Sequence, residues 1–136
     1  MKTTQELQAI ATQVRRDILR MTTAAKSGHP GGSLGTADWM TAMQFNILQQ
    51  DPAHFTMDGK GQDMLFVSQG HITPVIYSTM ARRGFFPVSE LSTFRQFGTR
   101  LQGHPPPPMP SPASAWLVAP SDRVLASVSV PPLAKK

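Results

Sequence analysis

Three of the four histidines in this 136-residue chain stand beside glycines. They are His29 in Ser-Gly-His-Pro-Gly-Gly, His71 in Ser-Gln-Gly-His, and His104 in Gln-Gly-His-Pro. A glycine lets the backbone approach a ligand closely, and the neighbouring imidazole can donate or accept a proton near neutral pH. These three residues are therefore the candidates for proton transfer and ligand binding. His54 has no such context, and we expect it at the surface.

The spacing of the histidines argues against a helical metal site. No two of them are four residues apart, and the chain has no cysteine, so neither a zinc-type helix motif nor a thiolate site is predicted. We assign no metal ligand. A lone histidine in a loop is more often a solvated residue than a catalytic one, and this alternative stands beside the functional one for each of the three.

The first elements that must position them are two helices. Apolar residues recur at helical spacing across residues 5–22, which predicts an amphipathic helix. Residues 26–35 hold four glycines and a proline and predict a break. A second helix is expected over residues 36–49, with Ile47 among its inward residues, and Asp51 before a proline should end it.

The next elements predict the start of an α/β fold. Residues 64–67 are a short apolar run, typical of a buried parallel strand, and His71 follows its carboxyl end, where ligands bind in open α/β sheets. A helix is expected over residues 74–83, with Gly84 at its C′ position and a further short helix capped by Ser89. We predict part of a parallel sheet flanked by helices.

Charge and hydropathy exclude several classes of protein. The net charge is +5, but basic residues form no run longer than a pair, which argues against a nucleic-acid-binding protein. A mild positive excess suits anionic small molecules such as sugar phosphates. No apolar run reaches eighteen residues and no apolar segment follows Lys2, so we expect no membrane span, no secretory signal and a cytoplasmic location.

Glycine and proline divide the chain into two parts. All ten glycines lie in residues 1–104, and nine of the thirteen prolines lie in residues 105–136. We therefore treat residues 1–104 as one unit and residues 105–136 as a proline-rich tail of different origin. Its opening should be extended and irregular, because proline fixes φ and removes a hydrogen-bond donor.

Taken together, these segments resemble the N-terminal, thiamine-diphosphate-binding part of transketolase. Residues 25–35, AKSGHPGGSLG, resemble the first signature of that family, and residues 63–71 resemble its strand-then-SKGH segment, with Gln69 where lysine or asparagine is usual. Residues 91–105 resemble the stretch that leads to a third family histidine. The resemblance covers about residues 5–105.

The resemblance implies a function and roles for the histidines. Transketolase transfers a two-carbon ketol unit between sugar phosphates in the pentose phosphate pathway, with thiamine diphosphate and Mg²⁺ as cofactors. By the family pattern, His29 and His104 bind substrate and act in catalysis, and His71 lies near the diphosphate of the cofactor. The family pattern also implies a homodimer, or a separate C-terminal subunit.

Two other interpretations stay open. A 1-deoxyxylulose-5-phosphate synthase-like protein shares the cofactor, but in that family leucine follows the first histidine, so Pro30 favours transketolase. A non-enzymatic module that offers its proline-rich tail to a binding groove is the second alternative.

The tail departs from the family, and a shifted reading frame accounts for the departure. The family's Ser-Leu-Gly-Gln-Gly-Leu-Ser-Val, written TCC CTC GGA CAG GGT CTT AGC GTC, reads Pro-Ser-Asp-Arg-Val-Leu-Ala-Ser from one base later, as at residues 120–127. Our hypothesis is two compensating frame changes, just after Pro105 and near Pro132. The tail then lacks the family's cofactor-site glycines, and the chain ends before the family's metal motif. We expect a fragment that is inactive alone.

Overall fold

A computed structural model describes residues 1–56, 60–104 and 116–118 of the chain. The elements are, in order, α1 (Thr4–Ala25), α2 (Pro30–Ala42), the π-helix η1 (Met43–Ile47), β1 (Leu65–Val67), the 3₁₀ helix η2 (Gly70–Ile72), α3 (Thr73–Arg83), the 3₁₀ helix η3 (Val88–Thr93) and β2 (Trp116–Val118).

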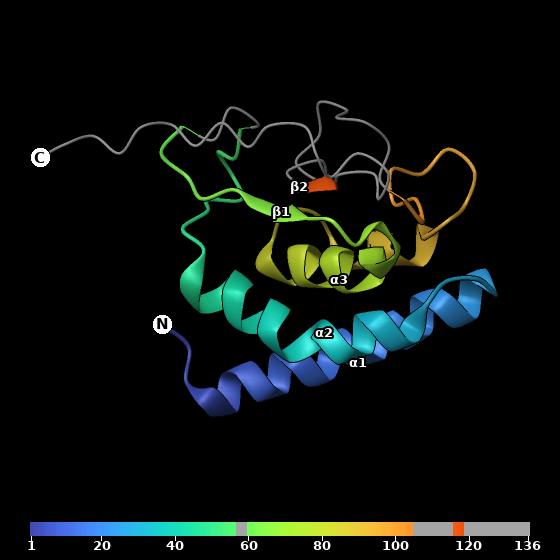
Figure 1. Cartoon of the computed structure of the whole chain (residues 1–136), viewed down its shortest axis with the longest axis horizontal. Helices are drawn as coiled ribbons and strands as arrows, with labels where there is room; N and C mark the ends of the chain where they lie inside the picture. The colour runs from blue at the N-terminus through green and yellow to red at the C-terminus, as the bar shows by residue number, and fades with distance from the viewer. Residues whose placement is uncertain (57–59, 105–115, 119–136) are drawn as a thin grey trace, which may run out of the picture.

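Helix α3 is the centre of the molecule. In Figure 1 it lies between the pair α1 and α2 on one side and the two strands on the other. Every residue from 73 to 81 is buried, as expected for a helix covered on all its faces. The helix ends at Gly84, whose φ of 101° is the left-handed conformation of a helix C-cap. The predicted helix over residues 74–83 is confirmed.

Helix α1 follows directly from its sequence. The Thr3 hydroxyl accepts a hydrogen bond from the Glu6 N–H, and the Glu6 carboxylate accepts one from the Thr3 N–H, which makes a capping box. The predicted apolar stripe faces the core, with Val14 and Ile18 fully buried. The helix ends at Lys26, which adopts the left-handed conformation.

Helix α2 corrects the prediction for residues 26–35. It begins at Pro30, not near residue 36, so three glycines lie inside it. A proline is suited to the first helical position because its missing N–H would have no partner there. Gly32 leaves room for the next layer, because a Cβ at this position would lie 3.1 Å from Ile72 Cγ2. Tertiary packing therefore outweighs the low helix propensity of glycine.

The end of this helix also differs from the prediction. The chain continues as the π-helix η1 and leaves helical geometry at Leu48, short of residue 49. A π-helix adds a residue to each turn, which shifts the inward face along the sequence. Ile47, predicted to point inward, is 58 % exposed, and Gln44 is fully buried in its place.

The sheet in the described part of the chain has two short strands. β1 and β2 pair in parallel, with Leu65 opposite Trp116 and Val67 opposite Val118. Val67 is buried but Phe66 is 65 % exposed, so the strand is buried on one face and not on both. The α/β class is thus realised in part, in a helix-rich arrangement.

The tail and the last helix need two further corrections. Residues 116–118 form a strand, which the expectation of an irregular tail did not include; the rest of residues 105–136 lies outside the described residues. The short helix near Phe94 is η3, and Pro87, not Ser89, stands at its N-cap position. Among the described residues, no helix combines the length and the apolar character that a membrane span needs.

Candidate functional site

The structure brings His29 and His71 together. His29 stands at the N-cap position of α2, and His71 lies in η2, which follows the carboxyl end of β1 as predicted. Their ring centroids are 5.6 Å apart and the rings meet edge to face at 76°. Both residues are exposed, so a ligand can reach the pair from solvent.

The N-terminus of α2 provides the second part of this site. The first backbone N–H groups of a helix have no partner within the helix and favour anions. Here the His29 side chain makes no capping hydrogen bond to them. The space around Gly31 is open, and His71 Nε2 would lie 3.5 Å from a Cβ at Gly32. Two imidazoles therefore flank an uncapped helix N-terminus, an arrangement that can bind a phosphate or diphosphate.

His104 is connected to this site through its backbone neighbours. The hydroxyl of Thr73, two residues after His71, donates to the Gly103 carbonyl at 3.0 Å. The Tyr77 hydroxyl donates to the Gln102 carbonyl at 2.9 Å. Both donors belong to α3, so the helix that follows His71 holds the segment that leads into His104. The His104 side chain is exposed.

His54 lies apart from the candidate site, as predicted. Its ring is within 2.7 Å of the Asp51 carboxylate in the loop after η1, and its side chain is 83 % exposed. The hydrogen bond from His54 holds the pKa of the Asp51 carboxyl below its ordinary value. His54 is a surface residue.

The sequence analysis missed Arg95. Its guanidinium donates from Nη1 to the Ser27 hydroxyl, 68 residues away, and its backbone has a φ of 61°. Few residues other than glycine adopt such a φ. An arginine between Phe94 and Gln96 has no glycine beside it, and only the fold reveals the contact with Ser27.

The described residues suit a diphosphate better than a metal ion. Nowhere in this part of the chain do three histidine or acidic side chains come together as a metal would require. The donors around the α2 N-terminus are N–H groups and imidazoles, which fit the anionic end of thiamine diphosphate. Mg²⁺, which prefers carboxylate and carbonyl oxygens, does not fit them.

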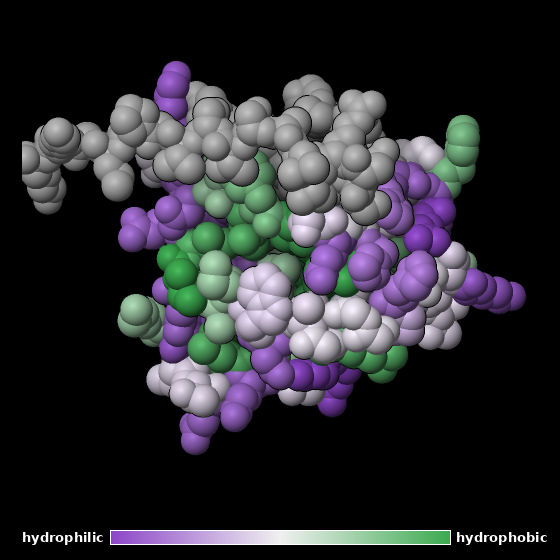
Figure 2. Space-filling model, viewed as in Figure 1, coloured by the Kyte–Doolittle hydropathy of each residue, from purple (hydrophilic) through white to green (hydrophobic). Residues whose placement is uncertain are grey.

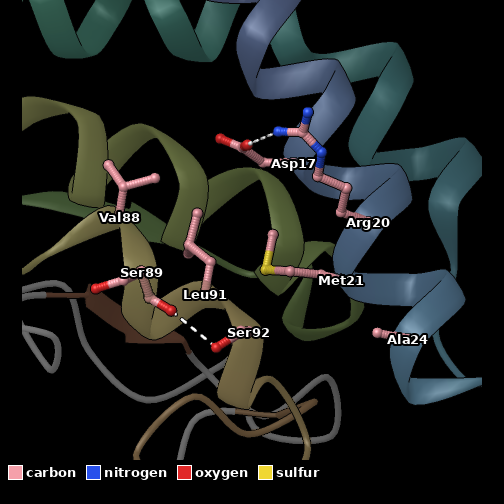
Figure 3. Close-up of a pocket in the computed structure, with 8 residues that line it drawn as sticks. All are labelled: Asp17, Arg20, Met21, Ala24, Val88, Ser89, Leu91 and Ser92. Atoms are coloured by element: carbon pink, nitrogen blue, oxygen red, sulfur yellow. Dashed lines mark hydrogen bonds and ion pairs between the residues drawn. The ribbon is translucent and has the colours of Figure 1, made fainter.

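A separate hollow of about 280 Å³ lies between α1 and η3 (Figure 3). Its lining comprises Asp17, Arg20, Met21, Ala24, Val88, Ser89, Leu91 and Ser92. Asp17 is already bound by Arg82 and Ser78, and Ser92 donates to the Ser89 carbonyl. With no histidine in the lining and its carboxylate engaged, we assign no chemistry to this hollow.

The comparisons with known proteins agree with the geometry. The family model for the transketolase thiamine diphosphate binding domain matches residues 7–110. The chain is 35 % identical over 109 residues to transketolase from Pongo abelii and 39 % identical over 83 residues to transketolase from Sinorhizobium medicae. The solved transketolase from Leishmania mexicana superposes with a TM-score of 0.65 over 77 % of the chain, at 27 % identity.

The chain therefore belongs to the transketolase family, in the region of its thiamine-diphosphate-binding domain. The match to the Pongo abelii protein covers 76 % of this chain and 17 % of that protein. The match to the Leishmania mexicana chain covers 77 % of this chain and 15 % of that one. A 6-deoxy-6-sulfo-D-fructose transketolase subunit from Clostridium is 32 % identical, over 73 % of this chain and 35 % of that subunit.

Proposed function

We propose that this chain supplies the histidine part of a transketolase-type site, which transfers a two-carbon ketol unit between sugar phosphates with thiamine diphosphate. The observation that carries the proposal is the edge-to-face pair of His29 and His71, 5.6 Å apart, at the open N-terminus of α2. These groups favour anions, and both the diphosphate of the cofactor and the phosphate groups of the substrates in such a reaction are anionic.

In this proposal, different residues bind the cofactor and the substrate. His71 and the first backbone N–H groups of α2 bind the diphosphate of the cofactor. His29 and His104, both exposed, bind the substrate hydroxyls and exchange protons with them, for which an imidazole is suited near neutral pH. When bound, thiamine diphosphate supplies the electron sink that carbon–carbon bond cleavage requires. The described residues offer no ligand set for Mg²⁺, so we derive no step through the metal.

We propose further that the site is completed by other protein. The chain spans 17 % of the Pongo abelii relative, and one Clostridium relative is named as a transketolase subunit. Large apolar side chains also remain at the surface, among them Trp39 at 45 % and Phe66 at 65 % exposure. Figure 2 shows hydrophobic side chains gathered on one face, bordered by hydrophilic ones. A second copy or a separate subunit that covers such residues is the partner we propose, with activity expected only in its presence.

The test is a titration of the purified chain with thiamine diphosphate, followed by the ring NMR signals of the four histidines. We expect weak binding that moves the signals of His29 and His71, leaves that of His54 in place and does not depend on Mg²⁺. His71→Gln should abolish the change and His54→Gln should preserve it. Ring signals of His29 and His71 that do not respond, or binding that requires Mg²⁺, would contradict the proposal.

A further inference from the structure

One side chain, that of Arg95, joins the segment that carries His29 to the segment that carries His104. Its Nη1 donates to the hydroxyl of Ser27, two residues before His29. The same guanidinium lies against Gly103, which directly precedes His104. An ideal Cβ at Gly103 would overlap both Nε and Nη2 of Arg95. The guanidinium thus occupies the space that a side chain at residue 103 would need.

Two aromatic side chains, those of Phe94 and Tyr77, pack beneath the guanidinium and support this contact. The guanidinium carbon of Arg95 lies 5.7 Å from the ring centroid of Phe94, a cation–π distance. Phe94 is 3 % exposed and meets Tyr77 edge to face at 6.2 Å. Tyr77 in turn donates to the Gln102 carbonyl. The guanidinium is therefore held between a buried aromatic pair and two surface segments.

The backbone of Arg95 adopts an uncommon conformation and closes the loop to residue 101. Its φ of 61° lies in the left-handed region, which an arginine adopts only when the surrounding structure imposes it. The N–H of Arg95 donates to the Leu101 carbonyl at 2.9 Å, which closes the intervening loop. This closure brings residues 101–103 back over the side chain.

We infer that Arg95 is a positioning residue that fixes His104 relative to His29, with its guanidinium lying where a Cβ at residue 103 would be. The inference rests on the proposed function, in which both histidines act on one substrate. It deepens that function by naming the group that sets their separation. Arg95 acts through Ser27 and Gly103.

The experiment compares Gly103→Ala, Arg95→Ala and the double variant by histidine ring NMR and by urea unfolding. Gly103 does not have a left-handed φ, so its added methyl group tests space alone. We expect each single variant to shift the signals of His29 and His104 alike and to leave His54 unchanged. The double variant should show no further shift, because either change displaces the guanidinium. In urea unfolding, the effect of the double variant on the equilibrium constant should differ by about tenfold from the product of the two single effects.

Two controls separate positioning from general loosening. Gly35→Ala adds the same methyl group where the space is open, and Arg100→Ala removes a guanidinium from the same loop, one that binds Glu90. We expect neither control variant to shift the His29 and His104 signals together. Arg95→Lys serves if Arg95→Ala does not fold, since it keeps the charge but loses the planar group.

Three results would overturn the inference: unchanged His29 and His104 signals in Gly103→Ala, equal shifts of all four histidines, or strictly additive effects in the double variant. No cofactor or substrate is added in this experiment. A chain that fails to bind thiamine diphosphate would contradict the proposed function and leave this result standing. If the chain binds the cofactor but the His29 and His104 signals do not change in Arg95→Ala, only the inference is contradicted.

Discussion

Arg82 of α3 binds the carboxylate of Asp17 of α1 through two hydrogen bonds, from Nε at 2.7 Å and from Nη2 at 3.0 Å. The Asp17 side chain is 4 % exposed, and its Oδ2 also accepts from the Ser78 hydroxyl at 2.8 Å. The pair thus fixes the central helix against α1 in a mostly dehydrated setting. Because the carboxylate has lost its water, its protein partners have to replace the hydration that it gave up.

Arg82→Ala should therefore lower the free energy of unfolding by about 3 kcal/mol, since it leaves a buried carboxylate without its main partner. The measurement is urea unfolding followed by circular dichroism. Arg15→Ala is the matched control. Arg15 pairs with Asp38 where the two side chains are 39 % and 73 % exposed, so its loss should cost no more than about 1 kcal/mol. Equal losses in the two variants would show that burial of the Asp17 pair is irrelevant.

Tyr77 should make the chain unstable in alkali. Burial raises the pKa of its hydroxyl above the ordinary value of 10.0. The folded chain therefore keeps this proton where the unfolded chain loses it. Its contribution to stability is full below pH 10.0 and falls as the pH rises towards the folded-state pKa. The chain has one tyrosine, so phenolate absorbance follows this group alone.

The check is urea unfolding from pH 8 to pH 11 in the original chain and in Tyr77→Phe. The variant should lose about 1 kcal/mol at pH 8, where the hydrogen bond to Gln102 is missing. It should lose less than the original chain as the pH rises further. Parallel pH curves for the two proteins would show that Tyr77 is not protected from ionisation in the folded state.

The sequence predicted the helices whose pattern is local. The apolar stripe of α1 and the Gly84 C-cap of α3 depend on residues within the helix itself. The first turn of α2 was not predicted, because its glycines are tolerated through packing against Ile72 from a different segment. The exposure of Ile47 results from the π-helix η1, which no residue pattern in the chain predicts.

The site was predictable to a similar degree. Glycine contexts singled out His29 and His71, and the strand before His71 placed it at a sheet end, but the 5.6 Å ring contact required the fold. The role of His104 stays a prediction from the family pattern. Arg95 carries no local signal, since its partners Ser27 and Gly103 come from two other segments.

Gln44 should be a point of instability that can be repaired. Gln44 is fully buried, with 0 % of its surface exposed, and within the described part of the chain neither its Nε2 nor its Oε1 has a hydrogen-bond partner. An unsatisfied buried amide costs about 1–3 kcal/mol. Gln44→Met, of similar shape, should raise the free energy of unfolding by about 1 kcal/mol. Gln44→Glu, which buries a carboxyl at the same place, should lower it, and a gain in both variants would contradict this account.

A methyl group at Gly32 should uncouple the histidine pair without unfolding the chain. A Cβ there would lie 3.1 Å from Cγ2 of the buried Ile72, which is tighter than an ordinary contact, so η2 must shift away from α2. His71 lies in the same short helix and should move with it, away from His29. If His71 and the α2 N-terminus together bind the cofactor's diphosphate, Gly32→Ala should weaken thiamine diphosphate binding about tenfold, the loss expected for one hydrogen bond to a charged group.

Gly35→Ala, the control, lies in the same helix with open space around it. It should stabilise the chain by about 0.5–1 kcal/mol while leaving binding unchanged. Ring NMR titrations and urea unfolding of the two variants measure both quantities. Equal affinities in the two variants would mean that His71 does not contact the cofactor, whatever its distance from His29.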